Sequence, residues 1–223
     1  MKHSFPNPTE PGRRVNLHIA GVGGTGSILA HQIVRLDLAM QALGHRGFSI
    51  TLWDPDIVEQ HNIGRQLFTE AEVGMSKVEA LATRLCNSYA VDIETVARPM
   101  QGERWADCLI CCVDTKDSRR ALHNTHTKWV FDCGNTADKG QVLMQHPDCP
   151  DTFAEFPGLT EGDEDTTPSC SLAESLGQQE LYINSFVANA CSQMLWQAFR
   201  HGGLDYRGVF IDLNNTIQTN TIQ

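Results

Sequence analysis

The sequence predicts an α/β fold, in which a mostly parallel sheet carries helices on both faces and antiparallel strands close it at the C-terminal end. Three observations support this class. Strand-like and helix-like stretches alternate through the first half of the chain. The stretch Cys108-Leu-Ile-Cys-Cys-Val113 is apolar throughout, as expected of a central strand that is buried on both faces. The C-terminal tail alternates polar and apolar residues, which is typical of a closing hairpin.

The first half of the chain supplies the expected parallel strands and their helices. Val15–Ala20 alternates apolar and polar residues and predicts the first strand, and Phe48–Trp53 predicts the second. Apolar residues near a 3.6-residue period predict helices over Thr25–Leu43 and Lys77–Tyr89. Further strands are expected at Val91–Ala97, Cys108–Val113 and Trp129–Asp132, with a short helix at Asp117–Asn124.

The second half of the chain is less regular. Gln141–Gln145 predicts one more strand, and Gln178–Arg200 predicts a long helix. Val209–Leu213 and the tail Thr216–Ile222 are expected to pair as the closing hairpin.

A long segment before that helix lacks any period. The residues from His146 to Pro168 show neither a helical nor a strand pattern, and such loops are usually functional or mobile. We therefore expect a mobile crossover loop at about 147–171, inserted in a single domain that spans residues 1–223.

Charge and composition exclude several classes of protein. The chain has 17 basic and 27 acidic residues and a net charge of -10, whereas a general nucleic-acid binder needs the opposite balance. No window of eighteen consecutive apolar residues is present, so no membrane span is expected. The polar N-terminus lacks the apolar core of a signal peptide, which favours a cytoplasmic protein with free thiols.

A glycine-rich loop stands at the first strand–helix junction. Gly21-Val-Gly-Gly-Thr-Gly26 follows the first strand and opens the first helix, the context that a Rossmann-like phosphate loop requires. Glycines let the backbone approach a phosphate, and the helix N-terminus supplies free N–H donors. Asp54, at the end of the second strand, can accept hydrogen bonds from a ribose hydroxyl.

The residues that follow Asp54 in the sequence help to decide whether the ligand is a dinucleotide or a triphosphate. Arg65 and Lys77 follow Asp54 in a polar, cationic stretch that a hydride-transfer enzyme does not need but a triphosphate does. Asp114 follows the central strand and could hold Mg²⁺. The chain contains no phosphate loop of the Gly-Lys-Ser/Thr type, which excludes the usual P-loop NTPases. A NAD-dependent oxidoreductase stays open as an alternative.

These motifs together resemble the ThiF/MoeB/HesA family, the bacterial relatives of ubiquitin-activating enzymes. The resemblance covers roughly residues 15 to 145 and is most like the PRTRC-system ThiF proteins, which share the Thr-Pro-Ser-Cys170-Ser loop. The other motifs that carry it are Gly21-x-Gly-Gly-x-Gly-Ser27, Trp53-Asp-Pro-Asp-Ile-Val58, Asn62-Ile-Gly-Arg-Gln66, Val73-Gly-Met-Ser-Lys77 and Cys112-Val-Asp114 with Arg119.

The resemblance implies ATP-dependent adenylation of the C-terminal carboxylate of a small ubiquitin-like or sulfur-carrier-like protein. The reaction needs positioning and charge neutralisation rather than a general base, because a carboxylate is already a nucleophile. The family's motifs also imply a role for each matching residue. They place the nucleotide on Gly21, Gly23, Gly24 and Gly26, its ribose on Asp54, its phosphates on Asn62, Arg65 and Lys77, and Mg²⁺ on Asp114, with Asp56 and Gln66 shaping the site.

Some family members then transfer the acyl group to a cysteine of the crossover loop. Cys170 occupies the matching place, just before a predicted helix whose N-terminus would favour the thiolate, although nearby carboxylates oppose this. An inert Cys170, or a role for Cys149 instead, stays open. Zinc is not expected, because Cys108 and Cys111 are three apart in a strand and point to opposite faces.

The remaining cysteines and histidines suggest no further chemistry. Cys112 and Cys133 are expected to be small core residues, and His123 and His126 to lie on a surface helix face. The family implies a homodimer and, in some members, a conjugating enzyme as partner. Alternative functions are an adenylating enzyme for a tRNA or non-protein substrate, and a non-catalytic family member that acts in assembly.

Overall fold

The structure is a computed structural model that describes residues 3–4, 13–101, 106–123, 127–147, 149–159, 177, 179–214 and 218–222. Within these ranges the main sheet has eight strands. They are β2 (Val15–Ala20), β3 (Phe48–Trp53), β4 (Ile93–Val96), β5 (Cys108–Cys111), β6 (Trp129–Asn135), β7 (Lys139–Gln145), β9 (Gly208–Asp212) and β10 (Gln218–Ile222).

The order of the strands creates a switch point in the middle of the sheet. Neighbours follow one another as β10-β9-β7-β6-β5-β2-β3-β4, and the five strands from β6 to β4 are parallel. The chain moves from β2 outward to β3 and β4, then returns to β5 on the other side of β2. The carboxyl ends of β2 and β5 lie side by side, but the connections that leave them run in opposite directions, and ligands of open α/β sheets bind at such a point.

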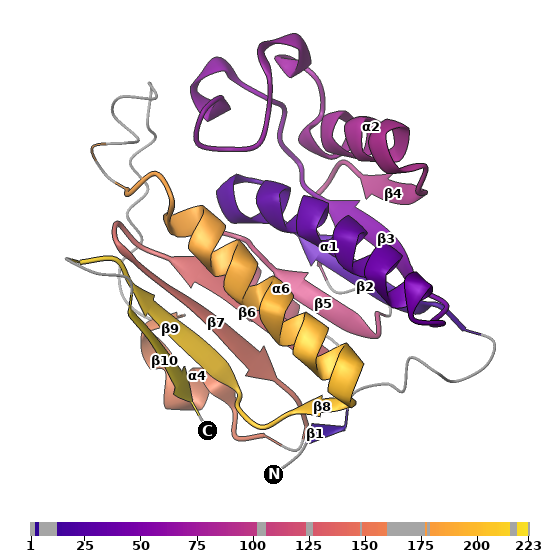
Figure 1. Ribbon diagram of the computed structural model, residues 1–223. Helices are drawn as coiled ribbons and strands as arrows, with labels where there is room; N and C mark the ends of the chain where they lie inside the picture. The colour runs from indigo at the N-terminus through magenta and orange to yellow at the C-terminus, as the bar shows by residue number, and fades with distance from the viewer. Residues whose placement is uncertain are drawn as a thin grey trace.

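Helices cover both faces of this sheet (Figure 1). On one face, α1 (Gly24–Ala42), α2 (Lys77–Tyr89) and α6 (Ile183–His201) pack on the larger apolar core, and α1 and α6 lie side by side. On the opposite face, α3 (Lys116–His123) contributes Leu122 to a smaller core with Trp53 and Leu109.

The predicted fold class is confirmed. The helix predicted at Lys77–Tyr89 has the expected bounds, and the closing hairpin forms with β9 and β10 antiparallel. Two strands of two residues each, β1 (His3–Ser4) and β8 (Gly203–Leu204), and the single 3-10 turns η1 (Gln60–Asn62) and η2 (Glu70–Glu72) were not predicted. Elements this short contain too few residues to show a period.

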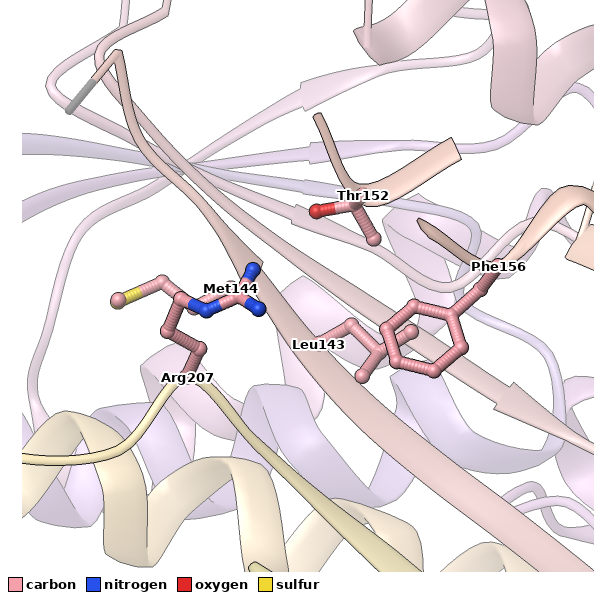
Figure 2. Close-up of a pocket in the computed structure, with 5 residues that line it drawn as sticks. All are labelled: Leu143, Met144, Thr152, Phe156 and Arg207. Carbon is pink, nitrogen blue, oxygen red and sulfur yellow. The ribbon is translucent and has the colours of Figure 1, made fainter. Parts of the chain in front are cut away.

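The segment expected to be a loop contains helical structure in its described part. The expectation of an irregular chain was wrong for α4 (Thr152–Glu155) and η3 (Pro157–Leu159). The side chain of Asp151 caps α4 by accepting from the amide of Phe153 at 2.9 Å, and Thr152 is buried. Figure 2 shows Thr152 and Phe156 beside Leu143 of β7 around a hollow that has no room for a water molecule. Residues 160–171 lie outside the described ranges.

Two cysteines of β5 behave as their spacing predicts. Cys108 belongs to the core under α1 and α6, whereas Cys111 belongs to the core on the opposite face. Among the described residues, no group of three or more His, Cys, Asp or Glu side chains is arranged to hold a metal ion. No helix in the described ranges combines the length and apolarity needed to cross a bilayer.

Candidate functional site

A cleft of about 490 Å³ opens at the switch point of the sheet. Its floor is made by residues at or just beyond the carboxyl ends of β2, β3, β5 and β6, and one wall is made by Asn184 of α6 and by Gln179, which precedes that helix. The polar and glycine residues that line it are Gly21, Gly23, Gly24, Thr25, Asp54, Asp56, Arg65, Gln66, Lys77, Asp114, Thr115, Ser118, Arg119, Gly134, Asn135, Gln179 and Asn184. Most of the residues predicted for the site are therefore brought together.

The glycine loop packs tightly against backbone atoms at two of its four predicted glycines. Gly21 has a φ of +86°, and a Cβ there would lie 2.7 Å from the carbonyl oxygen of Cys112. A Cβ on Gly26 would lie 1.9 Å from the carbonyl oxygen of Gly21. Both positions need glycine for the loop to close on itself, whether or not a ligand is bound. Gly26 does not line the cleft.

Gly23 and Gly24 differ from these two and from each other. A Cβ on Gly24 would lie 2.7 Å from the side-chain carboxamide of Asn184, which crosses over the loop from α6. A Cβ on Gly23 would meet only the side-chain nitrogen of Gln66, at 4.0 Å. Gly23 is also the residue before α1, whose first amides point out of the helix end. Open space in front of Gly23 is thus the part of the loop that a ligand can approach.

Asp54 holds the backbone of the glycine loop through hydrogen bonds. Its two carboxylate oxygens accept from the amides of Val22 at 2.7 Å and Asp56 at 2.9 Å. Burial raises the pKa of the Asp54 carboxyl above its usual value, although these two N–H donors oppose the shift. The carboxylate lines the cleft and at the same time fixes the backbone of the glycine loop, a structural role that sequence patterns do not reveal.

Lys77 reaches the cleft from the first residue of α2. Its Nζ lies 2.8 Å from a carboxylate oxygen of Asp56. The Lys77 side chain is 8% exposed and that of Asp56 is 61% exposed, so the ammonium group is enclosed while its partner faces water. Asp56 thus holds the Lys77 ammonium at the cleft, where an anion can share it.

Arg65 is the second cation of the cleft. It is half-buried, and its Nη1 donates to the side-chain oxygen of Gln179 at 3.0 Å. Its Nε is buried and has no hydrogen-bond partner among the described residues. Burial lowers the pKa of the Arg65 guanidinium, and the nearby charge of Asp114 opposes this shift. A half-buried guanidinium whose hydrogen-bond partner is a neutral amide is well suited to an anionic ligand.

The residues around Arg65 fix its loop. Asn62, which was predicted to contact phosphates, is buried and does not line the cleft; its side-chain oxygen accepts from the amide of Glu59 at 2.9 Å. The Asn62 carbonyl accepts from the amide of Gln66, and the hydroxyl of Ser27 accepts from the amide of Leu67 at 3.0 Å. Gln66 itself lines the cleft, with a buried side-chain oxygen that has no partner in the described part of the chain.

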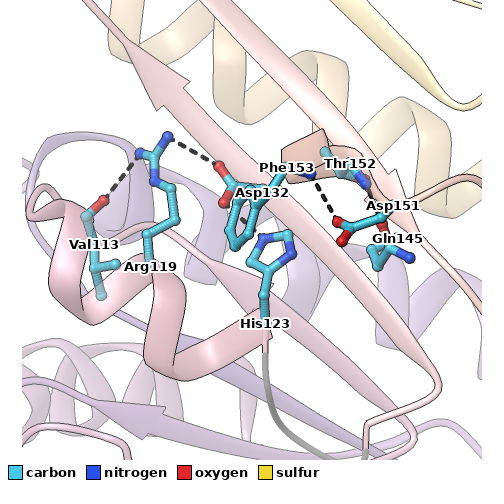
Figure 3. Close-up of polar contacts among 8 residues, drawn as sticks. All are labelled: Val113, Arg119, His123, Asp132, Gln145, Asp151, Thr152 and Phe153. Carbon is cyan, nitrogen blue, oxygen red and sulfur yellow. Dashed lines mark hydrogen bonds and ion pairs between the residues drawn. The ribbon is translucent and has the colours of Figure 1, made fainter. Parts of the chain in front are cut away.

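A buried charge cluster that the sequence did not predict is centred on Asp132 and reaches the cleft through Arg119 (Figure 3). Asp132 of β6 is fully buried and lies 3.3 Å from Nη1 of Arg119 and 2.9 Å from Nε2 of His123. Nη2 of Arg119 donates to the carbonyl of Val113, next to Asp114 in the chain. The expectation that His123 lies on a surface face was wrong, because its side chain turns inward to Asp132; His126 lies outside the described ranges.

The cleft is also lined by residues of α6, of the segment before it and of β6 that sequence reasoning missed. Asn184 and Gln179 line the cleft from a part of the chain more than 150 residues beyond the glycine loop. Asn135 joins them from the end of β6. The sequence shows only that Gln179 and Asn184 carry side-chain amides near the start of a predicted helix. It does not indicate which residues these amides contact.

The cysteines divide between the cleft and the rest of the protein. Cys112 is half-buried, and both Cys112 and Cys133 line the cleft, so their expected role as core residues alone was incomplete. Cys112 directly follows β5, and Cys133 lies near the carboxyl end of β6, so both reach the edge of the sheet where the cleft opens, which strand patterning could not show. Cys149 does not line the cleft, and Cys170 lies outside the described residues.

Comparison with known proteins identifies the family. The ThiF family matches residues 10–221, and the chain belongs to this family. A relative from Drosophila virilis, named ubiquitin-like modifier-activating enzyme 5, is 29% identical over 166 residues, which are 63% of this chain and 39% of the relative. The protein of the same name from Drosophila simulans is 31% identical over 63% of this chain and 39% of its own length. The chain thus spans about two fifths of these relatives.

Solved structures share the fold. A structure of MccB from E. coli superposes with a TM-score of 0.62 at 17% identity, over 93% of this chain and 61% of MccB. A structure of PaaA gives a TM-score of 0.60 at 18% identity, over 93% of this chain and 64% of PaaA. MccB has also been solved with ATP, and with AMPCPP and MccA.

Proposed function

We propose that this chain binds ATP in the cleft and uses it to adenylate the C-terminal carboxylate of a small ubiquitin-like or sulfur-carrier-like protein. The observation that carries this proposal is the position of two enclosed cations, Arg65 and Lys77, in the same cleft as the open side of the loop at Gly23. The names of the curated relatives, which are ubiquitin-like modifier-activating enzymes, support the choice of a small protein as substrate.

The cleft suits the polyphosphate of ATP. Phosphate oxygens would accept from the amides at the start of α1 beside Gly23, where a Cβ on the glycine would meet only the side-chain nitrogen of Gln66, at 4.0 Å. The Arg65 guanidinium and the Lys77 ammonium would neutralise their charge. Asp54, with its carboxylate on the cleft surface, would accept from a ribose hydroxyl.

The reaction requires little proton transfer. The carboxylate of the carrier protein attacks the α-phosphorus, so that an acyl adenylate forms and pyrophosphate leaves. Arg65 and Lys77 would stabilise the negative charge that develops on the phosphate oxygens. Asp114 is exposed at the rim and would hold Mg²⁺ together with the phosphates, which is how magnesium binds when a protein supplies only one or two carboxylates.

A second step, transfer of the acyl group to Cys170, stays a prediction. We expect Cys170→Ala to form adenylate normally and to lose any adduct with the carrier that a reductant can cleave. The adduct is measured by electrophoresis with and without thiol. An adduct that persists in this variant would move the nucleophile to another cysteine, of which Cys149 is the first candidate.

The adenylation itself is tested by exchange of labelled pyrophosphate into ATP. The probe is a ubiquitin-fold protein that ends in Gly-Gly, and the control is the same protein with its C-terminus amidated. We expect exchange with the free carboxylate only. Exchange that requires tRNA and ignores the carrier would instead favour the alternative substrate class. Absence of exchange with any acceptor, together with intact ATP binding, would favour a non-catalytic role in assembly.

The family resemblance also leads us to propose a homodimer, a conjugating enzyme as partner and a cytoplasmic location. Some family homodimers reach the partner's nucleotide with an N-terminal arginine, for which Arg13 and Arg14 are the candidates here. Within this chain Arg13 forms an ion pair with Asp107, and Arg14 donates to the carbonyl of Arg46 at 3.3 Å.

A further inference from the structure

A network of side-chain amides connects the glycine loop to Arg65. The side-chain oxygen of Asn184 accepts from the hydroxyl of Thr25 at 3.0 Å and from the amide nitrogen of Asn135 at 3.2 Å. The side-chain nitrogen of Asn184 donates to Gln179 at 3.3 Å, and the same oxygen of Gln179 accepts from Arg65 at 3.0 Å. Asn184 of α6 thus connects the first turn of α1, the end of β6 and, through Gln179, the loop that carries Arg65.

Asn184 is enclosed and touches the glycine loop directly. It is 4% exposed, and its carboxamide atoms lie 2.7–2.8 Å from the place where a Cβ of Gly24 would stand. The absence of a side chain at Gly24 is therefore explained by Asn184 rather than by a ligand. Gln179 is held in turn by its own amide group, which donates to the carbonyl of Thr136 at 3.2 Å.

We propose that Asn184 is a positioning residue for the phosphate groups of the nucleotide, because its carboxamide fixes the first turn of α1 and, through Gln179, the guanidinium of Arg65; this inference rests on the proposed function. A neutral amide is required at this place. It donates to Gln179 and accepts from Thr25, and it adds no charge next to the loop that receives an anion.

The substitution Asn184→Asp changes the charge of the side chain but keeps its size and shape. The aspartate has the same size and keeps the oxygen that accepts from Thr25 and Asn135. It replaces the donor to Gln179 with an acceptor and places a negative charge beside Gly24. Repulsion grows with the charge of the ligand, so we expect affinity to fall at least tenfold for ATP, less for ADP and least for AMP.

Isothermal titration calorimetry with these three nucleotides and Mg²⁺ measures the effect. The control is Asn189→Asp, which makes the same charge change on an exposed residue of the same helix, where Asn189 accepts from Gln32 at 3.1 Å. We expect this variant to bind all three nucleotides like the wild type. A second variant, Gln179→Ala, removes the hydrogen-bond acceptor of Arg65. We expect it to lower the affinity for ATP at least threefold and to leave the affinity for AMP unchanged.

The outcomes separate this inference from the proposed function. Wild-type affinity for ATP in both Asn184→Asp and Gln179→Ala would overturn the inference alone. An equal loss for all three nucleotides would also overturn it, because it would indicate a general distortion of the cleft. If Asn184→Asp does not fold, the affinity of Gln179→Ala for ATP is the test, and wild-type affinity in that variant would overturn the inference. Failure of the wild type to bind ATP would overturn the proposed function itself.

Discussion

Gly23 is the residue at which the protein leaves room for a ligand. Its neighbours in the glycine loop are constrained by protein atoms: Gly21 by the backbone of Cys112, Gly24 by Asn184 and Gly26 by the carbonyl of Gly21. The pattern of glycines in the sequence does not separate these causes, because each of them requires the same residue. Only the packed structure shows which glycine faces the open space.

A methyl group at Gly23 should therefore act on binding. We expect Gly23→Ala to lower affinity for Mg²⁺-ATP at least tenfold, since the added Cβ occupies the space in front of the first turn of α1. The control is Gly158→Ala, because Gly158 lies outside the cleft and a Cβ there would meet no atom within 4 Å. Calorimetric titration compares the two, with circular dichroism as the check on folding. Equal affinities would show that phosphate does not approach Gly23.

Asp54 gives stability a defined dependence on pH. Burial raises its folded pKa above the unfolded value of 3.8, so ionisation costs more in the folded state. Stability from this group is greatest when the carboxyl is protonated and is lost as pH rises from 3.8 through the raised pKa. We therefore compare the free energy of unfolding of the wild type with that of Asp54→Asn. The difference, wild type minus variant, should fall as pH rises across this window and stay constant at higher pH. Urea unfolding at a series of pH values measures it; a difference that does not change with pH would contradict the assignment.

At the scale of elements, α3 is attached to the sheet by charge as well as by apolar contact. Leu122 packs in the smaller core, while Arg119 and His123, one turn apart on α3, both contact Asp132 of β6. The ring of Phe153, from α4, lies against that of His123 at 4.0 Å between centroids. This arrangement also fixes the segment that carries Asp114, through the bond from Arg119 to the carbonyl of Val113.

Loss of this buried charge should destabilise the fold. We expect Asp132→Asn to lower the free energy of unfolding by about 3 kcal/mol, because it leaves the enclosed guanidinium of Arg119 without its counter-charge. The matched control, Asp117→Asn, removes an exposed pair with Arg120 on the same helix and should cost less than about 1 kcal/mol. Urea unfolding of both variants is the measurement. Equal effects would show that Asp132 contributes no more than a surface carboxylate.

At the scale of the whole molecule, local patterns predicted the framework and most of the cleft. The alternation of strands and helices predicts a mostly parallel sheet, and the carboxyl edge of that sheet brings Asp54, Arg65, Lys77 and Asp114 together from four separate motifs. Asp54 and Asp114 follow strand ends and Lys77 begins α2, so motif and secondary structure coincide there, whereas Arg65 lies in the loop between η1 and η2 and was indicated by its motif alone. Their position in the fold could therefore be predicted from the sequence.

The remaining part of the site depends on tertiary contacts that leave no local pattern. Asn184 lies in an ordinary amphipathic helix, and its partners Thr25 and Asn135 come from two other elements. Asn62 shows the opposite case: its motif position predicted a phosphate contact, whereas its side chain closes the turn η1. Sequence patterns locate a residue on an element but do not determine where its side chain is directed.

Thermal unfolding in the presence of different nucleotides distinguishes a cleft that binds a triphosphate from one that binds a dinucleotide. Mg²⁺-ATP, ATP with a chelator, and NAD⁺ or NADH are each added at saturating concentration. At one hundred times its dissociation constant a ligand stabilises a protein by about 2.7 kcal/mol, a shift of a few degrees in Tm. We expect such a shift with Mg²⁺-ATP, a smaller one in Lys77→Ala and in Arg65→Ala, and none with the nicotinamide nucleotides. A shift with NAD⁺ or NADH and none with ATP would contradict the account.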